Sequence, residues 1–383
     1  MASEGELIYE GSNFFRQRLT LATLCGKPIK IKNIRTSDAE PGLKEYEASF
    51  IRLLDKLCNG SQIVVNDTGT SVLYKPGILM GGQLDHSCSN QRAIGYYLEP
   101  LFMLSPFCKN PVIITLTGVT NNKVDPSIDM IRTSMLPVMK KFFGTDDELS
   151  LKLVKRGLQP GGGGTVTFTC PIRRTFRSFQ WLESGRVKRI RGVAYSSRVA
   201  PAVTNRMLDA AKKVFATFLT DVYFTVDNAK GKSPGFGLCT VAETNKGSYL
   251  SAESISNPPS DDVDIRLPED IGQEAAWRLL EEIYRGGCVD SLCQPLVLLF
   301  MILTSKDISK IVLGPLTPYS IHFLRHIRDF FQVTFKIDEY QDNADLFSDG
   351  DKEAEEKEFR CGEKKLVLTC VGIGYTNVSK GQI

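Results

Sequence analysis

The feature that most constrains the fold is an arrangement of helix-forming and strand-forming segments that recurs along the chain. The runs Gly81–Cys88 (GGQLDHSC) and Gly286–Cys293 (GGCVDSLC) have two glycines, an apolar residue, an aspartate and a cysteine in the same register. Each leads into an apolar segment of helix length, Ala93–Leu104 or Pro295–Leu303, and then into a β-rich run. The N-terminal region has the same order of segments without the paired glycines. This recurrence predicts that the chain contains three copies of one small unit.

A second helix follows in each unit and is expected to open close to a proline, at Pro41, Pro126 or Pro318. The first two prolines are 85 residues apart, whereas the second and third are 192 residues apart, and the excess is the length of a small domain. We therefore expect an α+β fold with one inserted α/β domain. The expected boundaries are 1–184 for the first two units, 185–281 for the insert and 282–383 for the third unit.

The charge is distributed unevenly, although the formal net charge is only +3. The segment Asp338–Glu358 contains ten acidic residues and two lysines, which predicts a solvated acidic loop or partner-binding tail at about 338–360. The rest of the chain therefore carries an excess of positive charge.

The densest basic stretch is Arg173–Arg191, which has one acid and also contains Phe176, Phe179 and Trp181. Guanidinium groups neutralise phosphates and aromatic rings stack on bases, so this composition favours contact with RNA. The alternative is a solvated strand edge whose charges prevent edge-to-edge pairing. The candidate RNA-contacting residues are Arg173, Arg174, Arg186, Lys188, Arg189 and Arg191.

The predicted helix at 317–333 carries a polar cluster. His322, Arg325, His326 and Asp329 are spaced so that one helix face would hold all four, with Arg328 beside them. Histidine, arginine and aspartate together can perform acid–base chemistry on an RNA phosphodiester. The alternative is a solvated face with an Arg325–Asp329 ion pair. The opposite, buried stripe is expected to consist of Ile321, Leu324, Ile327 and Phe331.

Composition argues against several classes of protein. The ten cysteines form no CxxC pair and there are only three histidines, so neither a metal nor another cofactor is expected. The glycine-rich runs lack the Walker A pattern and are expected to be turns. The longest apolar run, Leu296–Leu303, has eight residues, whereas a bilayer span needs about 20. The acidic N-terminal segment does not resemble a signal peptide. Reduced thiols and a cytosolic or nuclear location are therefore expected.

A series of short motifs, in a specific order and spacing, resembles the RNA 3'-terminal phosphate cyclase family over nearly the whole chain. The resemblance implies three translation-initiation-factor-like βαβαββ repeats with a smaller inserted domain. The matching runs are Gly26–Pro28, Ile34–Arg35 with Pro41–Leu43, Pro76–Gly77 with Gly81–Gly82, Arg156–Gly157 with Pro160–Gly163, and Gly286–Pro295.

The resemblance also implies that this chain lacks cyclase activity. The histidine that carries AMP in the cyclases falls on Tyr319, and a phenol does not replace a neutral imidazole at pH 7. The nucleotide loop of the family falls on Tyr9–Asn13, where two glycines are missing, and Phe14 follows it. Glycine lets backbone approach a phosphate closely, so their loss removes that approach. Arg16 and Asp290 remain as a relic of the nucleotide site, or as packing and capping residues.

Three runs resemble the cyclase-like branch of the family: Val119–Asn122, Arg285–Ser291 and Phe323–His326. This resemblance implies a nuclear, nucleolar factor for early small-subunit pre-rRNA processing, which works in the small-subunit processome. The implied partners are a large nucleolar GTPase and pre-rRNA, with no membrane, and the implied state is a monomer within that complex. A proposed endonuclease cluster of this branch falls on Arg325, His326 and Arg328. The alternatives are therefore a pre-rRNA endonuclease and a residual binder of nucleotide or RNA 3'-phosphate.

Overall fold

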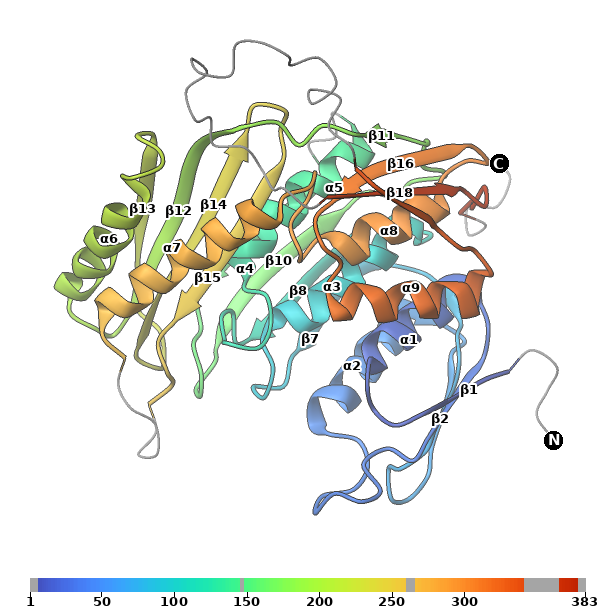
Figure 1. Ribbon diagram of the computed structural model, residues 1–383. Helices are drawn as coiled ribbons and strands as arrows, with labels where there is room; N and C mark the ends of the chain where they lie inside the picture. Colours follow the sequence, from blue (N-terminus) through green and yellow to red (C-terminus); the bar gives the residue numbers. More distant parts are fainter. Residues whose placement is uncertain (1–5, 145–147, 260–265, 341–364, 378–383) are drawn as a thin grey trace, which may run out of the picture.

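Sheets of four strands, each packed against helices, make up the described part of the protein (Figure 1). The computed structural model describes residues 6–144, 148–259, 266–340 and 365–377. These residues form four such sheets, all with mixed strand directions, and a two-stranded ribbon of β3 (Cys58–Asn59) and β6 (Ile78–Leu79). The expected α+β class is confirmed. The predicted acidic loop at 338–360 lies almost entirely outside the described residues.

The first sheet has the strand order β1-β2-β5-β4. Alternation explains which of its faces is buried: Ile29 and Ile31 point into the core, whereas Lys30 and Lys32 lie on the other face. Strand β4 forms one edge of the sheet. The elements are β1 (Leu7–Glu10), α1 (Phe15–Cys25), β2 (Ile29–Lys32), α2 (Glu45–Leu57), β4 (Gln62–Val65) and β5 (Val72–Lys75).

The second sheet has the order β7-β8-β10-β9, so β9 is an edge strand. Its second helical segment is interrupted, because a π-helical turn (Ile131–Met135) separates α4 (Ile128–Met130) from α5 (Leu136–Phe143). Pro137 follows this turn and has no N–H to donate, which is a common cause of such interruptions. The other elements are β7 (Gly82–Ser87), α3 (Ile94–Leu104), a 3₁₀ turn (Ser105–Phe107), β8 (Val112–Gly118), β9 (Ser150–Lys155) and β10 (Gly164–Cys170).

The third sheet has the order β11-β16-β18-β17. In each of these three sheets the first pair of strands is parallel and the next two pairs are antiparallel. Their apolar residues join in one large core. The elements are β11 (Gln180–Trp181), α8 (Gln294–Leu303), β16 (Ile308–Leu313), α9 (Pro318–Phe331), β17 (Lys336–Glu339) and β18 (Leu366–Val371).

The fourth sheet has a different order, β13-β12-β14-β15, and its own apolar cluster. Helices α6 and α7 lie against one of its faces (Figure 1), and Phe224 of β13 points into that helix-covered core. The elements are β12 (Val187–Ser197), α6 (Pro201–Phe215), β13 (Val222–Ala229), β14 (Gly235–Thr244), β15 (Tyr249–Ile255) and α7 (Pro268–Arg285).

The two glycine motifs do not have the same structure, so that part of the repeat interpretation is wrong. In the first motif, Gly82–Ser87 is strand β7, whereas the second motif is a loop that leads into α8. The cause is local, since Asp290 in the second motif accepts a hydrogen bond from the Cys293 backbone N–H at 3.0 Å and thereby stabilises the turn that precedes α8. Among the described residues, no helix has both the length and the apolar character needed to cross a membrane.

Candidate functional site

Helix α9, which carries the predicted polar cluster, packs against α1 near the N-terminus. The Thr317 hydroxyl accepts a hydrogen bond from the Ser320 backbone N–H at 3.1 Å, and Pro318 occupies the first turn, so the helix starts where the sequence predicts. The buried face consists of Ser320, Phe323, His326, Ile327 and Phe330. The predicted buried stripe is therefore wrong at Ile321, whose side chain is 39% exposed.

Tyr319, at the position implied for the cyclase histidine, is fixed between two charged side chains. Its hydroxyl donates to Glu99 Oε1 at 2.9 Å and accepts from the Arg16 guanidinium at 3.0 Å. Arg16 also forms an ion pair with Glu99 and donates to the Tyr96 carbonyl. Burial raises the pKa of the Tyr319 phenol well above its ordinary value, although the Arg16 guanidinium opposes the rise. The phenol is thus neutral at pH 7 and serves as a hydrogen-bonding bridge.

Phe14 fills the space between the start of α1 and α9. Its ring stacks on the imidazole of His322 with a centroid distance of 4.2 Å, and it lies 6.0 Å from the Tyr319 ring and 5.9 Å from the His326 ring. Phe14 has a φ of 56°, a left-handed conformation that bulky residues rarely adopt. These ring contacts offset the conformational cost, which is of order 1–3 kcal/mol.

His326 points inward and is separated from the arginines beside it in the sequence. Its Nδ1 lies 3.0 Å from the Gln17 side-chain oxygen, and Nε2 accepts from Arg18 Nε at 3.4 Å. Burial, followed by the positive charge of Arg18, lowers the pKa of His326 to about 3. The imidazole is therefore neutral and both of its nitrogens are engaged.

The structure does not bring the proposed endonuclease cluster together, because Arg325 and Arg328 are exposed whereas His326 is buried. Asp329 accepts a hydrogen bond from the Tyr9 hydroxyl at 3.1 Å, which is not the Arg325–Asp329 ion pair that we expected as the alternative. The single polar face predicted for this helix is therefore wrong. The polar side chains of α1 explain the difference, since Gln17 and Arg18 provide partners for a buried histidine.

The two relic residues lie in different environments. Arg16 belongs to the Tyr319–Glu99 group described above, whereas Asp290 accepts hydrogen bonds from the Ser251 hydroxyl at 2.6 Å and from the Cys293 N–H. Asp290 thus stabilises the turn before α8 and ties it to β15. Among the residues that the structure describes, no group of three or more His, Cys, Asp or Glu side chains is arranged to hold a metal ion.

The basic stretch 173–191 is divided among several environments. Arg173 lies over the Phe143 ring at 4.6 Å and donates to the Phe143 carbonyl, and Arg174 is exposed. Arg186 and Lys188 are also exposed. Arg189 pairs with Glu243, and Arg191 pairs with Asp221 at 2.8 Å. Three of the six candidate residues are therefore held by contacts within the protein, and the other three are exposed.

The aromatic residues of the same stretch are not free to stack on bases. Phe176 is buried, and Phe179 and Trp181 are partly buried against the large core. Phe142 lies 4.9 Å from Phe179 and 5.1 Å from Trp181, so these rings form one aromatic cluster. Their role is packing of β11, which forms an edge of the third sheet.

A buried charge network that sequence reasoning missed joins the second sheet to the fourth. Arg156, which follows β9, donates to Asp129 at 2.5 Å, to Asp227 at 2.8 Å and to Asn121 at 3.0 Å. Its guanidinium also lies 4.3 Å from the centre of the Tyr195 ring. Burial alone would raise the pKa of the Asp129 carboxyl, but the Arg156 guanidinium outweighs burial and holds it below its usual range. In the sequence, Arg156 stands out only as part of the Arg156–Gly157 motif, and that motif does not indicate which residues the arginine contacts.

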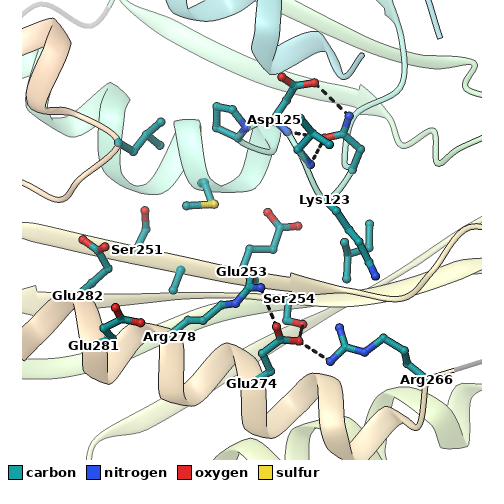
Figure 2. Close-up of a pocket in the computed structure, with 17 residues that line it drawn as sticks. Lys123, Asp125, Ser251, Glu253, Ser254, Arg266, Glu274, Arg278, Glu281 and Glu282 are labelled. Carbon is teal, nitrogen blue, oxygen red and sulfur yellow. Dashed lines mark hydrogen bonds and ion pairs between the residues drawn. The ribbon is translucent and has the colours of Figure 1, made fainter. Parts of the chain in front are cut away.

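A groove of about 520 Å³ lies beside this network, between the loop that follows β8 and the fourth sheet with α7 (Figure 2). Lys123 and Asp125 come from the loop, and Glu274 and Arg278 come from α7. The charges are largely paired within the protein, since Glu274 binds Arg266 at 2.5 Å and Arg278 at 2.7 Å. This groove is therefore a weak candidate for a ligand site.

Comparison with known proteins agrees with the motifs. The model of the family described as RNA 3'-terminal phosphate cyclase matches residues 7–337. A Bos taurus protein named RNA 3'-terminal phosphate cyclase-like protein is 51% identical, with 99% of each chain covered. The Homo sapiens protein of that name is also 51% identical, covering 98% of this chain and 97% of its own. The Schizosaccharomyces pombe protein named rRNA processing protein rcl1 is 41% identical, with 97% of each chain covered. This chain therefore belongs to the RNA 3'-terminal phosphate cyclase family.

Proposed function

We propose that this protein is a nucleolar factor for early small-subunit pre-rRNA processing that has no cyclase activity. It acts as a docking protein in the small-subunit processome, where it binds pre-rRNA and a large GTPase. The name of the Schizosaccharomyces pombe relative supports the role in rRNA processing, and the cyclase-like names of the other relatives support the lack of cyclase activity. The GTPase and the processome rest on the resemblance to the cyclase-like branch.

The observation that carries the proposal is the state of Tyr319. A cyclase needs a nucleophilic imidazole that is open to the α-phosphate of ATP. Here a neutral phenol is held between Arg16 and Glu99, and the Phe14 ring lies beside it. A phosphate cannot approach the start of α1 closely where a large ring is packed against α9.

The test is incubation of the purified protein with radiolabelled ATP and an RNA that has a 3'-phosphate. We expect neither a protein–AMP adduct nor a cyclic phosphate, with an active cyclase of the same family as the positive control. A stable adduct would refute the loss of activity. Depletion of the protein from cells should lead to accumulation of unprocessed small-subunit pre-rRNA, and a normal pre-rRNA pattern would refute the processing role.

We also propose that the first three sheets are copies of one βαβαββ unit and that residues 185–281 form an inserted domain between 1–184 and 282–383. The shared strand order of three sheets supports the repeat, and the separate apolar cluster of the fourth sheet supports the insert. The third sheet begins with β11 (Gln180–Trp181), which precedes the insert, so 1–184 contains more than the two units expected and the insert interrupts the third unit after its first strand. Helix α7 continues to Arg285 and leads back into that unit.

The geometry favours neither alternative function. An endonuclease built on Arg325, His326 and Arg328 needs a histidine that reaches the substrate, and His326 is buried against Gln17. A residual nucleotide site needs Arg16 and Asp290 in one pocket, and these two residues have different partners on different elements.

A further inference from the structure

An open groove of about 500 Å³ lies on the face of the fourth sheet that is opposite to α6 and α7. Its floor is formed by Val193 of β12 and by Thr225 and Asp227 of β13. These residues share a face, because Val193 is the register partner of Thr225 and side chains alternate along a strand. One wall is the end of β9, at residues 153–155, together with Arg156 after it. The groove therefore lies between the edge strand of the second sheet and the edge strand of the fourth.

The groove has more positive charge than the protein neutralises. Arg132, Lys155 and Lys230 line it, and its single acid, Asp227, is already bound by Arg156. Both lysines are exposed, and within the described ranges neither has an ion-pair partner. Arg132 is 3.4 Å from Asp129, but Arg156 holds that carboxylate more closely, at 2.5 Å. The four cations Arg132, Lys155, Arg156 and Lys230 exceed the two carboxylates Asp129 and Asp227 by two positive charges, which are available to an anionic ligand.

An exposed aromatic ring continues the same face beyond the groove. Tyr223 precedes Thr225 by two residues, so both side chains lie on one face of β13, and Tyr223 is 61% exposed. Its register partner on β12 is Arg191, whose guanidinium Asp221 holds in place. A ring at this position can stack on a base while the cations of the groove contact phosphates.

We propose that this groove binds a single strand of RNA, with phosphates at Lys155, Lys230 and Arg132 and a base stacked on Tyr223. The proposal rests on the proposed role in pre-rRNA processing and names the surface that contacts the RNA. The combination of cations with an exposed ring favours RNA over an acidic peptide, because a peptide carboxylate uses the charges but gains little from the ring.

The test is fluorescence anisotropy of labelled oligouridine, measured over a range of salt concentrations. A Lys155→Gln, Lys230→Gln variant should bind about 25-fold more weakly near 0.1 M salt, since each lost contact removes about 0.7 from the logarithmic salt slope. The matched control is Lys212→Gln, Lys213→Gln, which removes the same charge from the exposed side of α6 and should leave both affinity and slope unchanged. Equal losses in the two variants would overturn the proposal.

The ring is tested separately. Tyr223→Ala should lower the affinity for oligouridine by at least about 5-fold, whereas Tyr223→Phe should retain it, because stacking requires the ring and not the hydroxyl. Displacement of the RNA by polyglutamate, together with no effect of Tyr223→Ala, would show an acidic-peptide site and overturn the proposal. If the wild type binds RNA and none of these variants weakens the binding, the protein contacts RNA at another surface and the proposal for this groove is wrong. No binding of RNA by the wild type would overturn both.

Discussion

Replacement of Arg156 by methionine tests how the fourth sheet is fixed to the rest of the protein. Arg156 contacts Asp129 of α4 and Asp227 of β13, and its guanidinium lies on the Tyr195 ring of β12. Methionine keeps much of the apolar volume of the side chain but removes the charge and all the donors. The main consequence falls on Asp129, whose side chain is fully buried, and not on Asp227, whose side chain is 42% exposed.

The expected loss in free energy of unfolding is about 3 kcal/mol, the lower end of the cost of breaking a buried ion pair, because Arg132 and Asn121 still contact the Asp129 carboxylate, at 3.4 Å and 3.3 Å. The loss of Asp227 as a partner adds little, because water can solvate that carboxylate. Once Arg156 is absent, burial raises the pKa of Asp129 above its value in the unfolded chain. The penalty is then largest at neutral and higher pH, and it declines as the pH falls through the raised pKa.

The measurement is urea-induced unfolding of the wild type, of Arg156→Met and of the double variant Arg156→Met, Asp129→Asn, at pH 5 and pH 8. The double variant has no carboxylate at position 129 that lacks its closest partner, and it should recover most of the lost stability. The single variant should be less impaired at pH 5 than at pH 8. The reasoning is refuted if the double variant is as unstable as Arg156→Met, or if the loss is the same at both pH values.

Two further predictions concern the packing of α9 and α3. The buried imidazole of His326, whose pKa is lowered to about 3, must be neutral in the folded state, so protonation of the unfolded chain below pH 6.5 costs stability: about 2 kcal/mol between pH 7 and pH 5. His326→Gln should reduce the pH dependence of the thermal unfolding temperature, and an unchanged dependence would contradict the buried position. A Cβ atom at Gly95 of α3 would overlap the Pro126 carbonyl oxygen, so Gly95→Ala should destabilise the protein by about 1–3 kcal/mol despite the better helix propensity of alanine. Chemical denaturation would check this, and wild-type stability in Gly95→Ala would contradict the close contact.

Local pattern was sufficient to predict most helices and paired strands. The run Gln62–Val65 is strand β4 as expected, and the proline at 318 begins α9. The first strands of the units were missed. Strand β7 contains glycine, aspartate and histidine, which are poor strand formers, and it exists because it pairs in parallel with the apolar strand β8. Strand β11 has only two residues and depends in the same way on β16.

The orientation of α9 could not be read from its own sequence. Two stripes of apolar residues fit the helical period, one through Ile321 and Leu324 and the other through Phe323 and Phe330. The second stripe is buried because α1 supplies Gln17 and Arg18, which satisfy the polar atoms of His326. These partners lie about 300 residues away in the sequence, as the separations of 309 and 308 residues show. A polar residue can therefore be buried when a neighbouring element supplies hydrogen-bond partners for it, and the sequence of its own helix does not show whether such partners exist.

The same reasoning bears on whether the surviving polar residues indicate catalysis. Arg16, Glu99 and Tyr319 bind one another, and Phe14 packs on His322, so these side chains are occupied in joining α1, α3 and α9. Residues with such contacts are retained for stability whether or not a substrate is ever bound. Under the proposed function, a histidine at position 319 would therefore not restore adenylylation, because the Phe14 ring would still lie beside it and Arg16 would still be bound to Glu99. Restoring the chemistry would require the start of α1 to open as well, and that change would remove contacts that now hold three helices together.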